Sequence, residues 1–155
     1  MKYETNKFYG DINFKDSYEE VRSKLGKNVS LGERKFMGKL SKTILAHQTY
    51  IVFSNETSRI DYIEVKDSPV IFEGFNLFSK KYDELKYFFH SNDKSLIHLE
   101  EGFESNNLGL GCFFKTKNKK CFGYPKSIIL FSDTYARKIT PSPEDIINFY
   151  LKKNK

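Results

Sequence analysis

The sequence has no tryptophan, only two cysteines and only four prolines, and it contains no long apolar run. Two cysteines are too few for a disulfide scaffold, and the spacing of Cys112 and Cys121 does not match the Cys-x2–4-Cys pairs of zinc sites. No segment approaches the roughly 18 apolar residues of a membrane helix. The first ten residues, "MKYETNKFYG", lack the apolar core of a secretory signal. These absences predict a cytoplasmic protein with free thiols.

Aromatic residues are abundant, with 15 phenylalanines and 10 tyrosines among 155 residues. Aromatic side chains favour strands, and a chain of this length is typical of one domain, here residues 1–155. Too few helices are signalled to cover both faces of a sheet. We therefore predict an α+β fold, mainly an antiparallel twisted sheet of about six to eight strands, with two or three helices packed mostly on one face.

Three segments carry helix signals. The first has a capping box formed by Ser17 and Glu20, followed by apolar residues at helical spacing, and it ends at Gly26. The second is "SKKYDELKYFFHSN", with Ser79 as the expected cap, and the third follows Ser142.

Alternating apolar residues predict the strands. Four successive strands are expected in "ERKFMGKLS", "KTILAHQTYIVFS", "SRIDYIEVKD" and "PVIFEGFNLF", and three more in "SLIHLEEGFES", "LGLGCFFK" and "KSIILFSDTYARK". Their short connections indicate antiparallel neighbours. The expected core residues are Val21, Leu25, Leu85, Phe88, Ile128, Leu130 and Ile147.

The segment "NNLGLGCFF" contains a Gly-x-Gly pair at Gly109 and Gly111. A dinucleotide loop needs such a pair to open a helix, but "CFFKTKNKKCF" follows and is typical of a strand and a loop. Glycine inside a strand usually marks a bulge or a close backbone approach. We therefore interpret the pair as a backbone feature and Cys112 as a small buried residue.

Charge is distributed unevenly along the chain, whose net charge is +6. Residues 1–60 carry +4, residues 61–106 carry −5 and residues 107–155 carry +7. A basic total suggests a nucleic-acid partner. An acidic central third inside a basic chain predicts a protein with two electrostatic faces.

Two patterns keep other functions open. Glu64 and Lys66 are two residues apart in a strand, so they share a face, as in the Glu-x-Lys half of a metal-dependent nuclease site. The second acidic residue of such a site is missing nearby, because Asp61 has the opposite strand parity. The simpler interpretation is a solvated face, with Glu64 and Lys66 outward and Ile63 and Val65 inward.

The basic C-terminal third is the other pattern. "KTKNKK" lies among aromatic residues, an arrangement with which proteins grip single-stranded nucleic acid. The structural alternative is a solubilising hairpin tip whose neighbouring aromatics belong to the core. The aromatic residues concerned are Phe113, Phe114, Phe122 and Tyr124.

Five segments occur in an order that resembles small immunity proteins of bacterial polymorphic-toxin systems, including contact-dependent growth-inhibition immunity proteins. They are "GDINFKDSYEEVRSKLG", "IDYIEV", "PVIFEGFNLFSKKYDELKYFF", "NNLGLGCFF" and "SIILFSDTYARK", within residues 9–138. The resemblance implies a non-enzymatic cytosolic protein, without cofactor or metal, that binds and blocks one cognate toxin C-terminal domain of nuclease type. The basic net charge departs from the many acidic members that neutralise nucleases.

An immunity protein needs a rigid exposed surface and fast, tight association rather than a reactive group. Carboxylates of the acidic central third would suit a basic toxin groove. The candidate toxin-binding residues are Asp61, Glu64, Asp67, Glu73, Glu100, Glu101 and Glu104.

Overall fold

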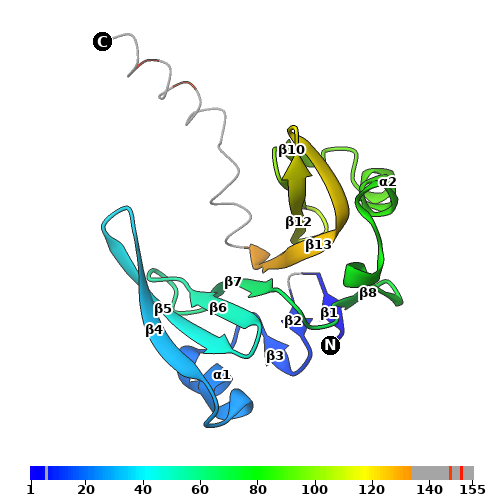
Figure 1. Ribbon diagram of the computed structural model, residues 1–155. Coiled ribbons are helices and arrows are strands. Elements are labelled where there is room, and N and C mark those ends of the chain that lie inside the picture. Colours follow the sequence, from blue (N-terminus) through cyan, green and yellow to red (C-terminus); the bar gives the residue numbers. More distant parts are fainter. Residues whose placement is uncertain (6, 134–146, 148–150, 152–155) are drawn as a thin grey trace.

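The computed structural model describes residues 1–5, 7–133, 147 and 151, and shows an α+β fold built on a mainly antiparallel sheet (Figure 1). The main sheet has eight antiparallel strands. In order across the sheet they are β10 (Ile97–Leu99), β11 (Gly102–Ser105), β12 (Leu110–Lys117), β13 (Lys120–Phe131), β7 (Ile60–Val65), β6 (Thr49–Phe53), β5 (Lys39–Ala46) and β4 (Ser30–Phe36).

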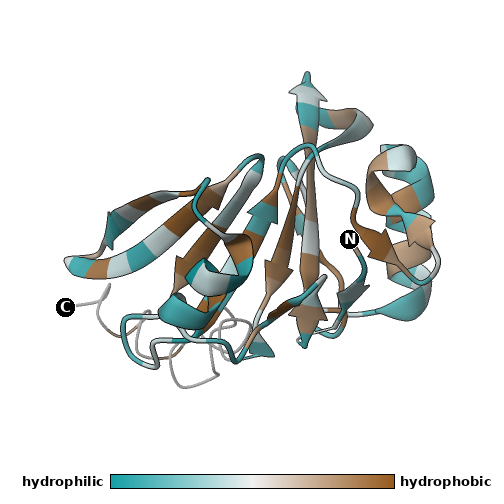
Figure 2. Cartoon of the chain, turned by 90° about the horizontal axis from the view of Figure 1, so that it is seen from below, coloured by the Kyte–Doolittle hydropathy of each residue, from teal (hydrophilic) through white to brown (hydrophobic). Residues whose placement is uncertain are grey.

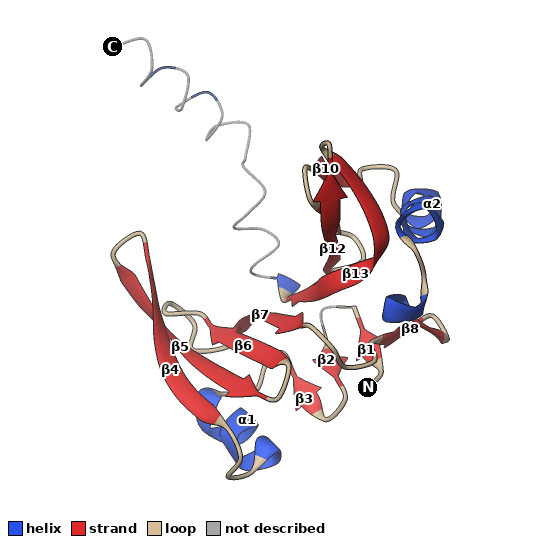
Figure 3. Ribbon diagram, in the orientation of Figure 1, coloured by secondary structure: helices blue, strands red, loops and turns tan. Residues whose placement is uncertain are grey.

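The main sheet consists of two meanders joined through their last strands (Figure 3). Strands β4 to β7 form one meander, β10 to β13 form the other, and β13 pairs with β7. The connection between the meanders carries the hairpin β8 (Ile71–Phe72) and β9 (Phe75–Asn76), the 3-10 helix η1 (Leu77–Ser79) and helix α2 (Tyr82–Asn92). The β7–β13 pairing therefore brings distant parts of the sequence side by side.

The N-terminal segment forms a small sheet and a helix. The strands β1 (Tyr3–Glu4), β2 (Phe8–Tyr9) and β3 (Ile12–Asn13) precede α1 (Tyr18–Leu25). The predicted capping box is confirmed, because the Glu20 amide donates to Ser17 Oγ at 3.2 Å and the Ser17 amide donates to Glu20 Oε2 at 2.7 Å. Gly26 ends the helix with φ of 79°, as its position predicted.

The predicted cap of the second helix is wrong. Ser79 belongs to η1, where its Oγ donates to the Asn76 carbonyl at 2.7 Å. The Asn76 side chain caps this turn by accepting from the Phe78 amide, so the chain has already turned before Ser79. Helix α2 starts after Lys81, whose amide donates to the Glu84 carboxylate at 2.9 Å.

The number of strands was underestimated. The described residues form thirteen strands, because several predicted strands contain hairpin turns. In three of these turns a residue other than glycine takes a positive φ, namely Met37 (50°), His47 (52°) and Glu73 (50°). Residues other than glycine seldom adopt this conformation, and the turns were not predicted although Gly38 and Gly74 follow two of these residues.

The core contains most of the residues predicted for it. Val21, Leu85, Ile128 and Leu130 are fully buried in one cluster, and Leu25 and Phe88 are partly buried against it. Ile147 is 58% exposed, so its predicted burial is wrong, because the described core does not cover it. The rest of the predicted third helix lies outside the described residues.

Figure 2 shows the apolar residues (brown) along the strands at the centre of the sheet. Helix α2, the longest helix in the described part of the chain, has 11 residues. No helix within these ranges is long and apolar enough to span a membrane.

Candidate functional site

One row of directly paired residues crosses all eight strands of the main sheet. Paired residues of antiparallel strands point to the same face, so this row defines one face, which we call the open face. From β10 to β4 the row is Ile97, Glu104, Gly111, Ile129, Glu64, Tyr50, Leu45 and Ser30. It combines two carboxylates with aromatic and aliphatic residues, and most of its side chains keep some exposure.

The next row along the strands points to the opposite face, which we call the covered face. Leu110, Leu130, Ile63, Ile51 and Ile44 are paired in this row, and all five are fully buried. They share the core cluster with residues of α1 and α2. The prediction that Ile63 points inward is confirmed, and its neighbour Glu64 lies on the other side of the sheet.

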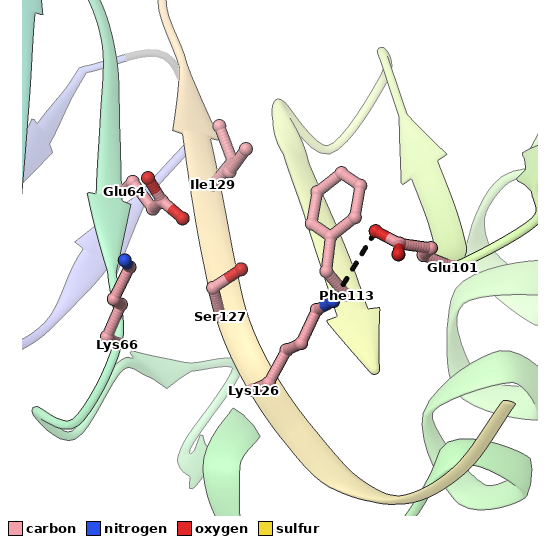
Figure 4. Close-up of a pocket in the computed structure, with 7 residues that line it drawn as sticks. All are labelled: Glu64, Lys66, Glu101, Phe113, Lys126, Ser127 and Ile129. Carbon is pink, nitrogen blue, oxygen red and sulfur yellow. Dashed lines mark hydrogen bonds and ion pairs between the residues drawn. The ribbon is translucent and has the colours of Figure 1, made fainter. Parts of the chain in front are cut away.

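The open face contains a shallow depression of about 520 Å³ (Figure 4). Figure 4 shows Glu64 on β7 and Ile129 on β13 close together, with Phe113 on the neighbouring β12. At one edge the Lys126 ammonium lies 3.4 Å from Glu101 Oε2. The lining residues are Glu64, Lys66, Glu101, Phe113, Lys126, Ser127 and Ile129. An apolar centre with a charged rim is typical of protein-binding surfaces.

A second apolar cluster lies beside this depression on the open face. Phe131, Tyr62 and Val52 are paired across β13, β7 and β6, and all three are buried. Tyr50 and Ile129 pack against them and are partly buried. The cluster is separate from the main core, so the open face holds apolar area of its own.

A basic side chain from the edge strand reaches this cluster. The Arg34 guanidinium on β4 donates to the Tyr62 hydroxyl, and its central carbon lies 5.8 Å from the centre of the Tyr62 ring. Arg34 and Tyr62 thereby connect the edge of the first meander to the strand that pairs with the second.

Three of the seven predicted toxin-binding carboxylates belong to this region. Glu64 and Glu104 are in the row that defines the open face, and Glu101 lines the depression. Glu100 is beside Glu101 in the β10–β11 turn, where its carbonyl accepts a hydrogen bond from the Cys121 thiol at 3.4 Å.

The other three carboxylates lie elsewhere. Asp61 has the opposite parity from Glu64 on β7, as predicted. Asp67 is exposed in the connection that follows β7. Glu73 is in the β8–β9 turn and lines a different depression, together with Lys2 and Lys7. The acidic central third therefore does not form a single surface.

Glu104 is half-buried and pairs directly with Gly111 on the neighbouring strand β12. A Cβ atom on Gly111 would lie 3.0 Å from Glu104 Cγ and 3.2 Å from Phe113 Cε2. Gly111 thus leaves room for both side chains on the open face, and the interpretation of the Gly-x-Gly pair as a backbone feature is confirmed. Burial raises the pKa of the Glu104 carboxyl.

Cys112 is fully buried on the covered face, as predicted, and burial raises the pKa of its thiol. Its carbonyl approaches β11 so closely that a Cβ atom on Gly102 would lie 2.0 Å from it. Cys121 is partly buried, and burial followed by the Glu101 charge raises its pKa as well. Within residues 1–5 and 7–133, no three His, Cys, Asp or Glu side chains gather as a metal site.

Sequence reasoning missed the aromatic and aliphatic partners of Glu64. Tyr50 and Ile129 pair with Glu64 from either side, but they come from β6 and β13. Alternation along each strand indicates which residues share its faces, yet it does not indicate which strands become neighbours. Comparisons with protein-family models, with curated proteins and with solved structures returned no match.

Proposed function

We propose that this chain is a non-enzymatic immunity protein, acting in the cytosol, that binds and neutralises a cognate bacterial toxin domain through its open face. The observation that carries the proposal is the composition of that face. Two half-buried carboxylates, Glu64 and Glu104, lie beside Tyr50, Phe113 and Ile129, and the depression at Glu64 is also lined by Lys66 and Lys126. The proposal takes α1 and α2 to lie on the covered face, which leaves the open face to the partner.

The carboxylates favour a basic partner. Neither Glu64 nor Glu104 forms an ion pair with another described residue. Partial burial of a carboxylate that forms no ion pair is unfavourable, and an arginine or lysine from a partner would offset that cost. A nuclease toxin with a basic groove offers such side chains, and exposed carboxylates would also accelerate its association.

The aromatic and aliphatic side chains would supply most of the affinity. Tyrosine and phenylalanine at the centre of an interface contribute large contact areas at a low entropy cost. An immunity protein needs a Kd of about 1 nM or lower, which is about −12 kcal/mol, because a few free toxin molecules harm the cell. The face combines anchors for affinity with charges for steering.

The proposal expects a toxin domain to be encoded beside this chain, at the C-terminus of a large secreted protein specified directly upstream, and the test uses that domain. Surface plasmon resonance with the two purified proteins should give nanomolar binding, and the chain should abolish the toxicity of that domain in cells. Glu64→Lys and Tyr50→Ala should each weaken binding at least about tenfold, which corresponds to about 1.4 kcal/mol. Association should slow as salt rises, while dissociation changes less.

Glu73→Lys is the matched control, because it makes the same charge change in the β8–β9 turn, away from the open face. It should leave binding nearly unchanged. If Glu73→Lys weakens binding and Glu64→Lys does not, the toxin binds elsewhere on the chain. Absence of any complex with the neighbouring domain would rule out the immunity function.

A further inference from the structure

The hairpin formed by β12 and β13 carries an unusual concentration of positive charge. Residues 105–132 contain five lysines and no aspartate or glutamate. Lys126 pairs with Glu101 at 3.4 Å, whereas the other four form no ion pair within the described part of the chain. These four, all exposed, are Lys115, Lys117, Lys119 and Lys120.

The shape of the hairpin holds these charges close together. Asn118 and Lys119 have φ of 51° and 61°, which makes a tight two-residue turn. The register places Lys117 directly opposite Lys120. Like charges in such a pair destabilise a hairpin, so this arrangement is unfavourable for folding and favourable for binding an anion. In Figure 1 the tip lies far from strands β4 to β7.

Two exposed aromatic side chains follow the tip on β13. Phe122 is 48% exposed and pairs directly with Lys115, so the two share a face of the hairpin. Tyr124 is 55% exposed, and Lys81 Nζ lies 5.9 Å from the centre of its ring. Gly123 between them has φ of 73°, which bends the strand at that point. Exposure of these apolar rings to water is unfavourable, but exposed rings can stack on other planar groups.

We infer that this hairpin, defined by Lys115, Lys117, Lys119, Lys120, Phe122 and Tyr124, is a binding site for single-stranded nucleic acid. Lysines neutralise successive phosphates, and aromatic rings stack on unpaired bases without regard to sequence. An acidic protein surface would pair with the lysines but would offer no bases for the aromatic rings. In duplex DNA the faces of the bases are stacked on one another and cannot contact those rings. The presence of both features favours a single strand. The site is distinct from the open-face residues proposed to bind the toxin.

The test measures fluorescence anisotropy of the full chain with a labelled oligothymidine of about 12 nucleotides, near the upper part of the range for such sites. The variant Lys117→Ala/Lys119→Ala/Lys120→Ala should bind at least about tenfold more weakly. Its log–log salt dependence should also be shallower by about 2, since each phosphate contact on a single strand contributes about 0.7. Phe122→Ala should weaken binding about fivefold or more without changing the salt slope.

The matched control removes the same charge from exposed lysines elsewhere, in Lys15→Ala/Lys27→Ala/Lys35→Ala, and should bind nearly as the original chain does. Tyr87→Ala, at a tyrosine that is 79% exposed on α2, is the control for Phe122. Thermal unfolding of every variant checks that the fold is kept.

Several results would overturn the inference. One is an equal loss of oligothymidine affinity in the lysine variant and in its control. Another is an affinity for duplex DNA equal to that for oligothymidine. A third is displacement of oligothymidine by polyglutamate as effectively as by unlabelled oligothymidine. The last of these would indicate an acidic protein as the partner. Hairpin variants that keep full toxin affinity while losing oligothymidine would separate this site from the proposed immunity function.

Discussion

The two faces of the main sheet differ although their residues alternate along the same strands. On β7, Ile63 is fully buried in the core, while the adjacent Glu64 is half-buried beside Tyr50 and Ile129. Successive side chains of a strand point to opposite sides, so one sequence segment serves two environments. The covered face belongs to the main core, and the open face is the one proposed to bind a partner. Substitutions on the two faces should therefore be detected by different measurements.

The largest expected effect is on the covered side. Phe89 is fully buried and packs against Phe103, with 5.1 Å between ring centres. Phe89→Ala should lower the free energy of unfolding by about 3–5 kcal/mol, because it removes a large buried ring and leaves a cavity. Urea-induced unfolding measures this loss. Phe113→Ala, which truncates the same residue type on the open face, should cost clearly less.

Phe88 provides an intermediate case. It is only partly buried, although its ring centre lies 4.9 Å from that of Phe75 in an edge-on contact. Phe88→Ala should therefore cost less than Phe89→Ala and more than Phe113→Ala. Equal losses at all three positions would mean that the open face contributes as much to stability as the covered face does.

Local patterns were predictable from the sequence, and distant pairings were not. Ser17, Glu20 and Gly26 act within one helix, and the alternation of Ile63 with Glu64 acts within one strand, so neighbouring residues suffice to predict them. The pairing of Ile129 with Glu64 depends on how two meanders join, which no local propensity encodes. The candidate site spans that junction. Three of the seven carboxylates named from the sequence lie there, whereas its apolar partners were not predicted.

The hairpin turns are a second feature that was not predicted from the sequence. At Met37 and His47 the chain adopts positive φ without a glycine at the same position. Strand pairing on both sides holds each residue in a conformation that its own propensity disfavours. A reader of the sequence sees one long strand at each place, whereas the structure has two.

A smaller effect is expected at the end of α2, where a buried carboxylate links the helix to the sheet. Asp93 accepts hydrogen bonds from Ser105 Oγ at 2.7 Å, from Asn107 Nδ2 at 2.9 Å and from the Ser95 amide and hydroxyl. Burial alone would raise the pKa of Asp93, but these hydrogen bonds outweigh it and lower the pKa below its usual value. The folded protein therefore favours the ionised form.

The pH dependence follows from that direction. Stability from Asp93 is fully present above the pKa of the unfolded chain, and it is lost as pH falls through the lower pKa of the folded protein. Asp93→Asn should lower the free energy of unfolding at neutral pH by about 1–3 kcal/mol, and the loss should shrink in acid. Chemical unfolding at several pH values measures this. Asp67→Asn, at an exposed carboxylate, is the control and should show little change.

The smallest effect on stability is expected at Glu104, and its sign is opposite. Burial raises the pKa of Glu104, so the folded protein favours the protonated carboxyl. Its contribution to stability is present below the pKa of the unfolded chain and is lost as pH rises through the higher pKa of the folded protein. Glu104→Gln, which is neutral at every pH, should therefore stabilise the fold near neutral pH by less than about 1 kcal/mol. That gain should disappear in acid.

The same substitution should weaken binding of the neighbouring toxin domain, because it removes a carboxylate that would meet a basic side chain. A residue that reduces stability and increases affinity is expected at a binding surface rather than in a core. Thermal unfolding and surface plasmon resonance on the same protein samples measure both quantities. Glu33→Gln on β4, an exposed residue, should change neither. If Glu104→Gln instead lowers stability and leaves binding unchanged, Glu104 has a structural role. This part of the open face would then stabilise the fold, as the covered face does, and would not bind the toxin.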